Sequence, residues 1–254
     1  FESVWIDGLG MDPWGRKMSK SLGNGIDADS VLECGAGGRT GSWKIKGPEG
    51  KQVSLKANKI GSECFRLWKA CDAQVGDDFH INPEEIESKY FGVLTKMFNI
   101  ARLASQFEVP KSLDSSPNDL AFEDLWILSE FDEMMQSVRN SWEKMDIYSA
   151  TQSIKAFSTG IFPGHWLEMS KSRLYDGDIS ATWTLHRIVR DILTVFSPVC
   201  PFFTDYLSTT LYEHSAVDIR KFPSLAVTEI VDVAPYLSIT DDLIDFNSRI
   251  WKMK

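Results

Sequence analysis

The chain has 254 residues, 43% hydrophobic and 25% charged, which is ordinary for a globular protein of one large or two modest domains. It contains no run of about 18 apolar residues, so we expect no membrane span. The net charge of −9 argues against a protein that coats nucleic acid through a broad basic surface. Only residues 1–70 are basic, with 11 Lys and Arg against 8 Asp and Glu, so any RNA contact should be a local patch.

The four cysteines do not have the spacing of a metal site. None of Cys34, Cys64, Cys71 and Cys200 forms a C-x-x-C pair, and no His lies at ligand spacing beside them. Cys64 and Cys71 are seven residues apart and can share one helix face as small buried side chains. We therefore expect no bound metal.

The chain begins with a predicted strand and a loop. Residues 3–6, Ser-Val-Trp-Ile, predict a short β-strand, and turn residues follow up to Gly15. A strand leading into a phosphate-holding loop is common in open α/β sheets, where ligands bind beyond the carboxyl ends of the strands. One strand is visible here, so we expect most of such a sheet to lie in another part of a longer protein.

The segment Lys17–Ser21, with the sequence KMSKS, has the composition of a mobile phosphate-holding loop. Its lysines are flexible point charges suited to phosphate oxygens, and its serines are small hydrogen-bond donors. Gly15 and Gly23 on either side permit the backbone change that a closing loop needs. A basic surface loop is the alternative interpretation. We expect the loop to be open or disordered.

A short helix and a β-hairpin are predicted next. Asp27, Asp29 or Ser30 can cap a helix through Leu32. Two alternating runs within 43–55 then flank a Gly-Pro-Glu-Gly turn, which is typical of a hairpin. The hairpin carries five lysines: Lys44, Lys46, Lys51, Lys56 and Lys59. They fit an RNA-contacting flap or a solvated edge hairpin, and we prefer the second because exposed strands carry Lys for that reason alone.

Two helices follow the hairpin. Apolar residues at helical spacing predict the first from Ser62 to Cys71, and a short extended piece at 75–81 follows it. Asn82, with Pro at the next position, starts the second helix. Its predicted buried stripe consists of Ile86, Tyr90, Phe91, Leu94, Phe98, Ala101, Leu103 and Phe107.

A polar linker at 111–118 is a plausible domain boundary, and almost everything beyond it predicts helices. The first predicted helix is capped within 116–119 and runs to about 144, and the second covers 148–172 with interruptions at Gly160, Pro163 and Gly164. A third helix runs from Asp178 to Ser197 and continues from Pro201. A strand at 230–233 and a last helix capped within 240–242 follow.

The pentapeptide Lys17–Ser21 matches, letter for letter, the signature loop of class I aminoacyl-tRNA synthetases, and Leu22–Asn24 continues in the usual way. The chain resembles this family over nearly its whole length apart from residues 36–60, and it is most similar to the valyl subfamily of archaeal type, with isoleucyl next. Further resemblances lie at Phe65–Trp68, Gly76–Phe79, Leu125–Ser129, His165–Tyr175, Ser197–Phe203 and Phe246–Lys252. Gly61–Glu63 departs from the Gly-Ala-Asp that is usual in this family.

The resemblance implies a mainly α fold: an anticodon-binding helical bundle preceded by a small α/β remnant of a Rossmann-type catalytic domain and a β-hairpin insertion. The implied domains are 1–35 at the end of the catalytic domain, 36–60 for the insertion, 61–112 for a helical stem-contact region and 113–254 for the anticodon-binding domain.

The resemblance also implies a function. The implied reaction is adenylate formation: the carboxylate of an amino acid, valine for the valyl subfamily, attacks the α-phosphate of Mg·ATP and pyrophosphate leaves. Lysines placed by closure of the loop stabilise the transition state. Lys17 and Lys20 are the implied catalytic residues, and the implied ATP contacts are Lys17, Met18, Ser19, Lys20 and Ser21. The implied partners are ATP with Mg²⁺ as a substrate, valine and tRNA, with no tightly bound cofactor, in a cytoplasmic monomer. The partner His-rich signature is absent, so we expect the chain to be inactive alone.

Unpaired tRNA bases are read by aromatic stacking and by hydrogen bonds to their edges. The candidate contacts are His165, Trp166, Lys171, Arg173, His186, Arg187 and Arg190. For Trp166 and His186 we prefer core packing, because aromatics at helical spacing are usually core. The alternatives are a helical RNA-binding module without chemistry and a nucleotidyltransferase that uses the same loop without tRNA, and the long helical region argues against the latter.

Overall fold

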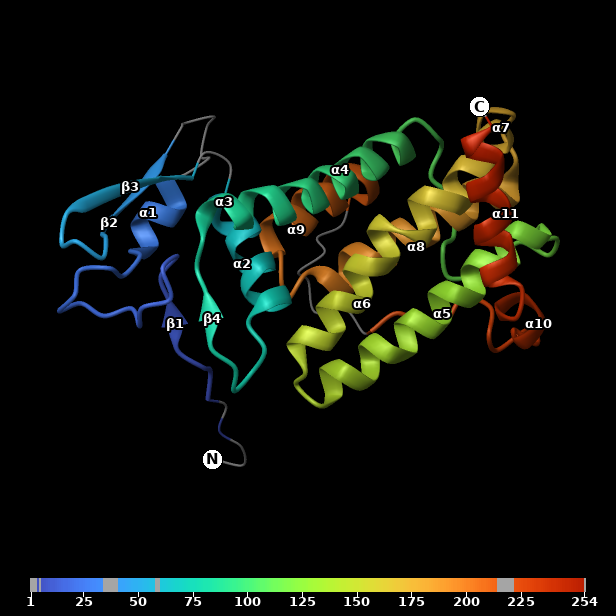
Figure 1. The fold of residues 1–254 in the computed structure, drawn as a ribbon. Helices are drawn as coiled ribbons and strands as arrows, with labels where there is room; N and C mark the ends of the chain where they lie inside the picture. The colour runs from blue at the N-terminus through green and yellow to red at the C-terminus, as the bar shows by residue number, and fades with distance from the viewer. Residues whose placement is uncertain (1–3, 5, 34–40, 58–59, 214–221, 254) are drawn as a thin grey trace. The chain divides into compact units, whose positions relative to one another are not determined.

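The computed structural model describes residues 4, 6–33, 41–57, 60–213 and 222–253. The chain forms two compact units, Phe1–Thr95 and Lys96–Lys254 (Figure 1). The predictions for Cys34 and Lys59 fall on residues outside the described ranges. Within these ranges, no helix is both long enough and apolar enough to cross a membrane.

The first unit contains two small sheets. Strands β1 (Gly10–Met11) and β4 (Phe79–His80) pair in parallel, with Gly10 opposite Phe79. Strands β2 (Ser42–Lys46) and β3 (Gln52–Lys56) form the predicted antiparallel hairpin. The helical segments of this unit are α1 (Ala28–Glu33), α2 (Gly61–Asp72), α3 (Pro83–Ile86) and the π-helical turn η2 (Glu87–Phe91).

The core of the first unit lies between the hairpin and α2. Trp43 of β2 contacts Phe65 with 6.2 Å between the ring centroids, and Phe65 contacts Trp68 at 5.1 Å. Trp68 in turn meets Phe79 of β4 at 5.9 Å. The ring contacts therefore connect both sheets through one face of α2. Cys64 and Cys71 lie buried in the same helix, as the seven-residue spacing predicted.

The first strand is not where the sequence predicted it. Val4 and Ile6 are exposed and belong to no strand, and residues 3 and 5 lie outside the described ranges. The strand forms at Gly10–Met11 because β4 supplies its hydrogen-bond partners there: Phe79 N donates to Leu9 O at 3.1 Å, and Ile81 N donates to Met11 O at 2.9 Å. An apolar run without a neighbouring strand has no ladder of hydrogen bonds to join, and the backbone of exposed residues such as Val4 and Ile6 can bond to water instead.

Helix α4 (Gly92–Ala104) leads from the first unit into the second, whose described part contains helices, turns and irregular segments but no strand. Helix α5 lies beside α6 and α8, and α8 lies beside α9 (Figure 1). The elements are α5 (Phe122–Glu143), α6 (Ile147–Thr159), the π-helical turn η3 (Phe162–Trp166), α7 (Leu167–Tyr175), α8 (Ile179–Phe196), α9 (Pro201–Tyr212), α10 (Ala234–Leu237) and α11 (Thr240–Lys252).

The predicted stripe on the helix after Asn82 is partly wrong. Phe91 and Phe98 are exposed, whereas Met97 and Ala104 are buried. The predicted stripe was too wide, because buried residues recur every three or four positions through η2, at Ile86, Tyr90, Leu94, Met97, Ala101 and Ala104. The cap itself was predicted correctly, since Asn82 accepts a hydrogen bond from Glu84 N.

Two boundaries in the second unit also differ from the predictions. Helix α5 begins at Phe122 rather than near 116–119, because Ala121 is extended and its N–H donates to Ser180 Oγ at 3.0 Å. The strand predicted at 230–233 is a turn. Asp132 accepts hydrogen bonds from the backbone of Ala226, Val227 and Thr228 at 2.6–2.8 Å, which folds the chain back just before this segment.

Candidate functional site

The loop in the first unit is built on a buried carboxylate. Asp12 is fully buried and accepts hydrogen bonds from the backbone N–H groups of Trp14 and Arg16, each at 3.0 Å. Arg16 Nε also donates to it at 2.8 Å. Burial alone would raise the pKa of Asp12, but the hydrogen bonds from Asn24, Arg16 and Trp14 outweigh it and lower the pKa below its ordinary value. Asp12 therefore stays ionised and keeps the turn closed.

Asn24 closes the loop from the other side. Its Nδ2 donates to Asp12 Oδ2 at 2.9 Å and to Lys17 O at 3.2 Å, and its Oδ1 accepts from Ser19 N at 2.9 Å. Gly15 and Gly23 have φ of 78° and 65°, so the turns that bound the loop use the left-handed region that glycine adopts without strain. The loop is thus folded and hydrogen-bonded, so the expectation of a disordered loop is wrong for this structure.

The cationic side chains of the loop point to no acidic partner. Lys17 and Lys20 are exposed, and no carboxylate in the described part of the chain pairs with either. Ser19 Oγ lies 3.2 Å from Ser21 Oγ, and Met18 is anchored through its N–H to Gly10 O at 2.9 Å. A fixed backbone that carries two uncompensated ammonium groups and two hydroxyls can hold phosphate oxygens.

The loop is joined to the hairpin. Lys46 N donates to Gly23 O at 3.0 Å, and the Arg16 guanidinium donates to Lys46 O at 2.5 Å. A Cβ on Gly23 would lie 3.2 Å from the Lys46 side chain, so the absence of a side chain at position 23 permits this close approach. The loop and strand β2 therefore form one hydrogen-bonded structure.

Three of the predicted RNA contacts lie in the core of the helical unit. Trp166 is fully buried, and its Nε1 donates to Asp124 at 2.9 Å. His186 is fully buried between Tyr212 Oη and Phe107 O, each at 3.3 Å. Arg187 is 1% exposed and binds Asp191 and backbone carbonyls. The preferred interpretation of Trp166 and His186 as core residues is therefore confirmed, and Arg187 is likewise buried and not available to contact RNA.

Two further candidates, Arg173 and Arg190, are held in ion pairs. The Arg173 guanidinium contacts Asp124, Asp178 and Glu123 at 2.7–3.0 Å. Arg190 pairs with Asp114 and Asp191, each at 2.8 Å. Arg173 ties α7 to α5 and to the start of α8, whereas Arg190 ties α8 to the non-helical segment before α5. A contact with RNA would have to compete with these carboxylates.

His165 and Lys171 are partly exposed, as Arg173 and Arg190 are, but neither is held by more than one carboxylate among the described residues. Lys171 lines a surface hollow of about 360 Å³ together with Lys96, Asn99 and Glu168, and pairs with Glu168 at 2.6 Å. His165 lies in the adjoining turn η3, 5.2 Å from the Trp251 ring. Burial lowers the pKa of His165, so its imidazole is neutral at pH 7.

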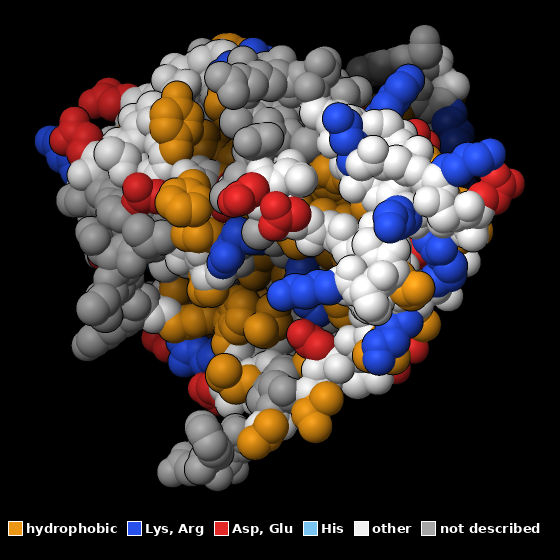
Figure 2. Space-filling model, turned by 90° about the vertical axis from the view of Figure 1, so that its left-hand side faces the viewer, with side chains coloured by type: hydrophobic (Ala, Val, Ile, Leu, Met, Phe, Trp, Pro, Cys, Tyr) orange, Lys and Arg blue, Asp and Glu red, His pale blue; other side chains and the backbone are white. Residues whose placement is uncertain are grey.

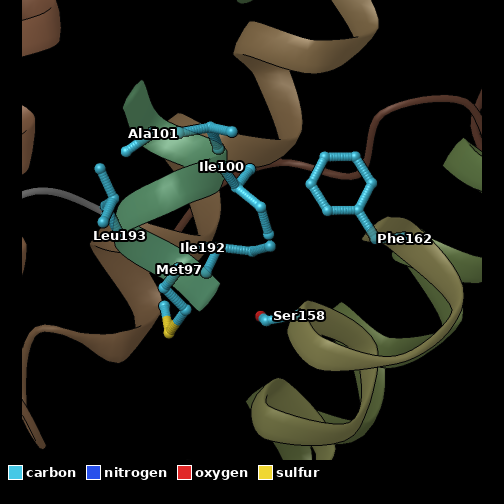
Figure 3. A pocket seen from close by; sticks show the side chains of 8 residues that line it. Met97, Ile100, Ala101, Ser158, Phe162, Ile192 and Leu193 are labelled. Atoms are coloured by element: carbon cyan, nitrogen blue, oxygen red, sulfur yellow. The ribbon is translucent and has the colours of Figure 1, made fainter. Parts of the chain in front are cut away.

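A second cavity in the helical unit is too small for a nucleotide (Figure 3). It measures about 20 Å³, which is room for roughly one water molecule. Apolar side chains of α4, η3 and α8 line it, and Ser158 of α6 contributes the single hydroxyl. Ser158 Oγ is buried and has no hydrogen-bond partner among the described residues.

The described residues include no group of three or more His, Cys, Asp or Glu side chains placed to hold a metal ion. Cys64 belongs to the core: burial, with a smaller contribution from Glu87, raises the pKa of its thiol to about 12.

Sequence reasoning missed the polar residues that build these sites. Asp12 and Asn24 organise the loop, and Asp124 organises the helical unit. The sequence did indicate a turn at Asp12, because a proline follows it and a glycine comes shortly afterwards. For Asp124 the available signal was an acidic residue in phase with the buried positions Trp126, Ile127 and Leu128 of α5.

The comparisons with known proteins agree with this arrangement. The family described as "Anticodon-binding domain of tRNA ligase" matches residues 124–252, and "tRNA synthetases class I (I, L, M and V)" matches residues 1–82. The chain belongs to the class I tRNA synthetases. The synthetase match in the first unit includes the loop, and the anticodon-binding match covers α5 through α11.

Several curated proteins similar to this chain are valine–tRNA ligases. Those of Aeropyrum pernix and Nanoarchaeum equitans are 29% and 25% identical over the whole of this chain, and that of Saccharolobus solfataricus is 30% identical over 89% of it. The chain spans 28%, 29% and 24% of their respective lengths.

A solved structure shares the synthetase fold. The chain matches a crystal structure of the ternary complex of Agrobacterium radiobacter LeuRS, tRNA and LeuAMS with a TM-score of 0.63 and 15% identity, over 89% of this chain and 24% of that one. This agreement supports the fold: a mainly helical anticodon-binding bundle preceded by small sheets.

Proposed function

We propose that this chain is part of a valine–tRNA ligase, which activates valine with ATP and transfers it to tRNA. The observation that supports ATP contact is the folded loop with exposed, unpaired Lys17 and Lys20. Valine rather than isoleucine is proposed because the reported relatives are valine–tRNA ligases. Since the chain spans about 28% of such a relative, activity is expected of the longer protein and not of this part alone.

In the proposed reaction, a carboxylate oxygen of valine attacks the α-phosphorus of ATP, and the bond to the bridging oxygen breaks as pyrophosphate leaves. Negative charge then develops on the phosphate oxygens. Lys17 and Lys20 supply positive charge to these oxygens, while Ser19, Ser21 and the backbone at Met18 orient the loop. ATP enters with Mg²⁺ as a substrate, and no tightly bound cofactor is required.

The second unit is proposed to bind the anticodon stem and loop of tRNA. His165 and Lys171, beside the surface hollow, are the candidate contacts that the fold leaves accessible. We keep the division into 1–35, 36–60, 61–112 and 113–254 as the proposed assignment of roles along the chain. The proposed longer protein is a cytoplasmic monomer.

The test is ATP–pyrophosphate exchange by the full-length protein with valine, measured without tRNA. Lys20→Ala should lower kcat/KM for ATP by about 100-fold, because one preorganised contact to developing charge is removed. Lys89→Ala is the matched control, since Lys89 pairs with Asp72 away from the loop, and it should leave the exchange unchanged. Exchange that Lys20→Ala does not alter would contradict the role of the loop, and faster exchange with isoleucine would contradict the valine assignment.

A further inference from the structure

The hairpin β2–β3 presents its outer face in a fixed orientation. On the inner face, Trp43 and Ile45 are 1% and 2% exposed, and the Trp43 ring packs against Phe65. Because side chains alternate along a strand, burial of this face turns every other residue outward. The hydrogen bond from Lys46 N to Gly23 O also ties the end of β2 to the loop.

The outer face carries hydrogen-bond donors and no carboxylate. Its six residues, all exposed, are Ser42, Lys44, Lys46, Gln52, Ser54 and Lys56. The strand register places Ser42 opposite Lys56, Lys44 opposite Ser54, and Lys46 opposite Gln52. Each cross-strand pair therefore combines one lysine with one neutral donor.

Edge protection alone does not account for this composition. An edge strand is protected by charges of either sign, and opposite charges across a strand pair stabilise a hairpin. Edge protection alone would therefore favour mixed charges, whereas Lys44 and Lys56 are diagonal neighbours of like charge. Elsewhere in the same unit, Lys51 pairs with Glu49 and Lys89 with Asp72. Within the described ranges, no carboxylate pairs with Lys44, Lys46 or Lys56. In a chain of net charge −9, this face keeps three uncompensated positive charges.

The ligand that this face fits is a polyanion with hydroxyl groups. Lysines contact phosphate oxygens as point charges, and Ser and Gln can bond phosphate oxygens or the ribose 2′-OH. Figure 2 turns the side of Figure 1 that carries β2 and β3 toward the viewer, and Lys and Arg side chains gather on one half of that view. We propose that the outer face of β2–β3 binds the sugar–phosphate backbone of tRNA. This inference rests on the proposed function, which makes tRNA the partner.

The test compares two double variants of the full-length protein that remove the same charge. Lys44→Gln with Lys56→Gln removes two lysines of the outer face and leaves Lys46, which contacts the loop, in place. Lys51→Gln with Lys89→Gln removes two lysines that already have acidic partners. Binding of a tRNA transcript with a valine anticodon is measured by filter retention at several salt concentrations.

The outer-face variant should bind tRNA about tenfold more weakly near 0.1 M salt, and the slope of log K against log salt should fall by about 1.5 to 2. The paired-lysine variant should keep the slope of the unmodified protein. Lys44→Arg with Lys56→Arg should also keep it, which separates loss of charge from damage to the hairpin. Valine-dependent ATP–pyrophosphate exchange without tRNA should be the same in all four proteins.

The outcomes separate this inference from the proposed function. If the unmodified protein binds tRNA and the outer-face variant has an unchanged slope, the inference is overturned and the proposed function stands. If the unmodified protein catalyses valine-dependent exchange but binds no tRNA, tRNA transfer and this inference are both overturned. If it catalyses no exchange yet the outer-face variant loses salt-dependent tRNA binding, the hairpin assignment stands and the enzymatic proposal fails.

Discussion

At the scale of single residues, the loop depends on one amide side chain. Asn24 is fully buried and makes hydrogen bonds to Asp12, Lys17 and Ser19. These bonds fix the backbone on both sides of Met18, so the positions of the two lysines depend on a residue that carries no charge. Removal of a buried amide also leaves its former partners unsatisfied, which costs more than the bonds themselves.

We predict that Asn24→Ala lowers the free energy of unfolding by about 2 kcal/mol. It should also lower kcat/KM for ATP in the exchange reaction by about 10- to 100-fold, because the phosphate-contacting groups lose their fixed geometry. Urea denaturation and exchange kinetics of the full-length protein measure the two effects.

Asn82→Ala is the control for this prediction. Asn82 caps α3 through a hydrogen bond from Glu84 N at 3.2 Å, so its loss should cost about 1 kcal/mol of stability without a change in kcat/KM for ATP. Equal losses of exchange in both variants would mean that Asn24 acts only through stability.

At the scale of helices, the second unit is fastened by polar groups at buried positions. Asp124 of α5 receives hydrogen bonds from Trp166 of η3, Arg173 of α7 and Ser180 of α8. Satisfied networks of this kind hold helices in one arrangement, whereas a buried polar group without a partner lowers stability. Ser158 of α6 is a buried polar group of this destabilising kind, since its hydroxyl lines the apolar cavity without a hydrogen-bond partner among the described residues (Figure 3).

Ser158→Ala should therefore raise the free energy of unfolding by about 1 kcal/mol, because it removes an unsatisfied hydroxyl and improves helix propensity. Ser129→Ala is the matched control: Ser129 is also a buried helical serine, but its Oγ donates to Leu125 O at 2.7 Å. Urea denaturation should show a gain for the first variant and none for the second. A loss of stability in Ser158→Ala would contradict the prediction.

At the scale of the whole molecule, stability should depend on pH through buried histidine. His186 joins α8 to Tyr212 of α9 and to Phe107. Burial lowers its pKa from the usual 6.5, and the hydrogen bond to Phe107 O opposes this only in part. Burial lowers the pKa of His165 as well. The folded state therefore binds protons more weakly than the unfolded state at these positions.

The stability from these groups is complete above about pH 6.5 and falls as the pH decreases toward the lower folded pKa. For His186 the slope should reach at most about 1.4 kcal/mol per pH unit. We predict that His186→Gln flattens the dependence between about pH 6.5 and 5 in urea denaturation, although the variant is less stable at neutral pH.

Tyr212→Phe provides the comparison for the pH experiment. It removes the hydroxyl 3.3 Å from His186 Nδ1 but leaves the imidazole buried, so the slope should persist while overall stability falls. A slope that is the same in the unmodified protein and in His186→Gln would show that other groups cause the pH dependence.

Much of the fold follows from patterns within a few residues. The hairpin around Gly47–Gly50, the caps at Asn82 and Asp178, and the start of α9 at Pro201 were predicted correctly. In each case the residues that specify the feature are also the ones that form it: a turn residue adopts its own backbone angles, and a capping side chain bonds an amide two or three positions away. The proposed role of Lys17–Ser21 rests on the same kind of local information, because these residues are consecutive.

Other features depend on partners far along the chain, and local patterns contain no information about them. Trp166 and Asp124 are 42 residues apart, and Asp132 and Thr228 are 96 apart. The first bond holds Trp166 in the core, as its helical spacing predicted, and the second folds the chain back before a segment that was predicted to be a strand. Similarly, the strand at Gly10–Met11 exists because β4 lies beside it. Helices, caps, the core positions of Trp166 and His186 and the loop sequence are thus readable from neighbouring residues. The burial of Arg187 follows from packing, since whether a charged side chain faces water depends on what the folded chain places against it.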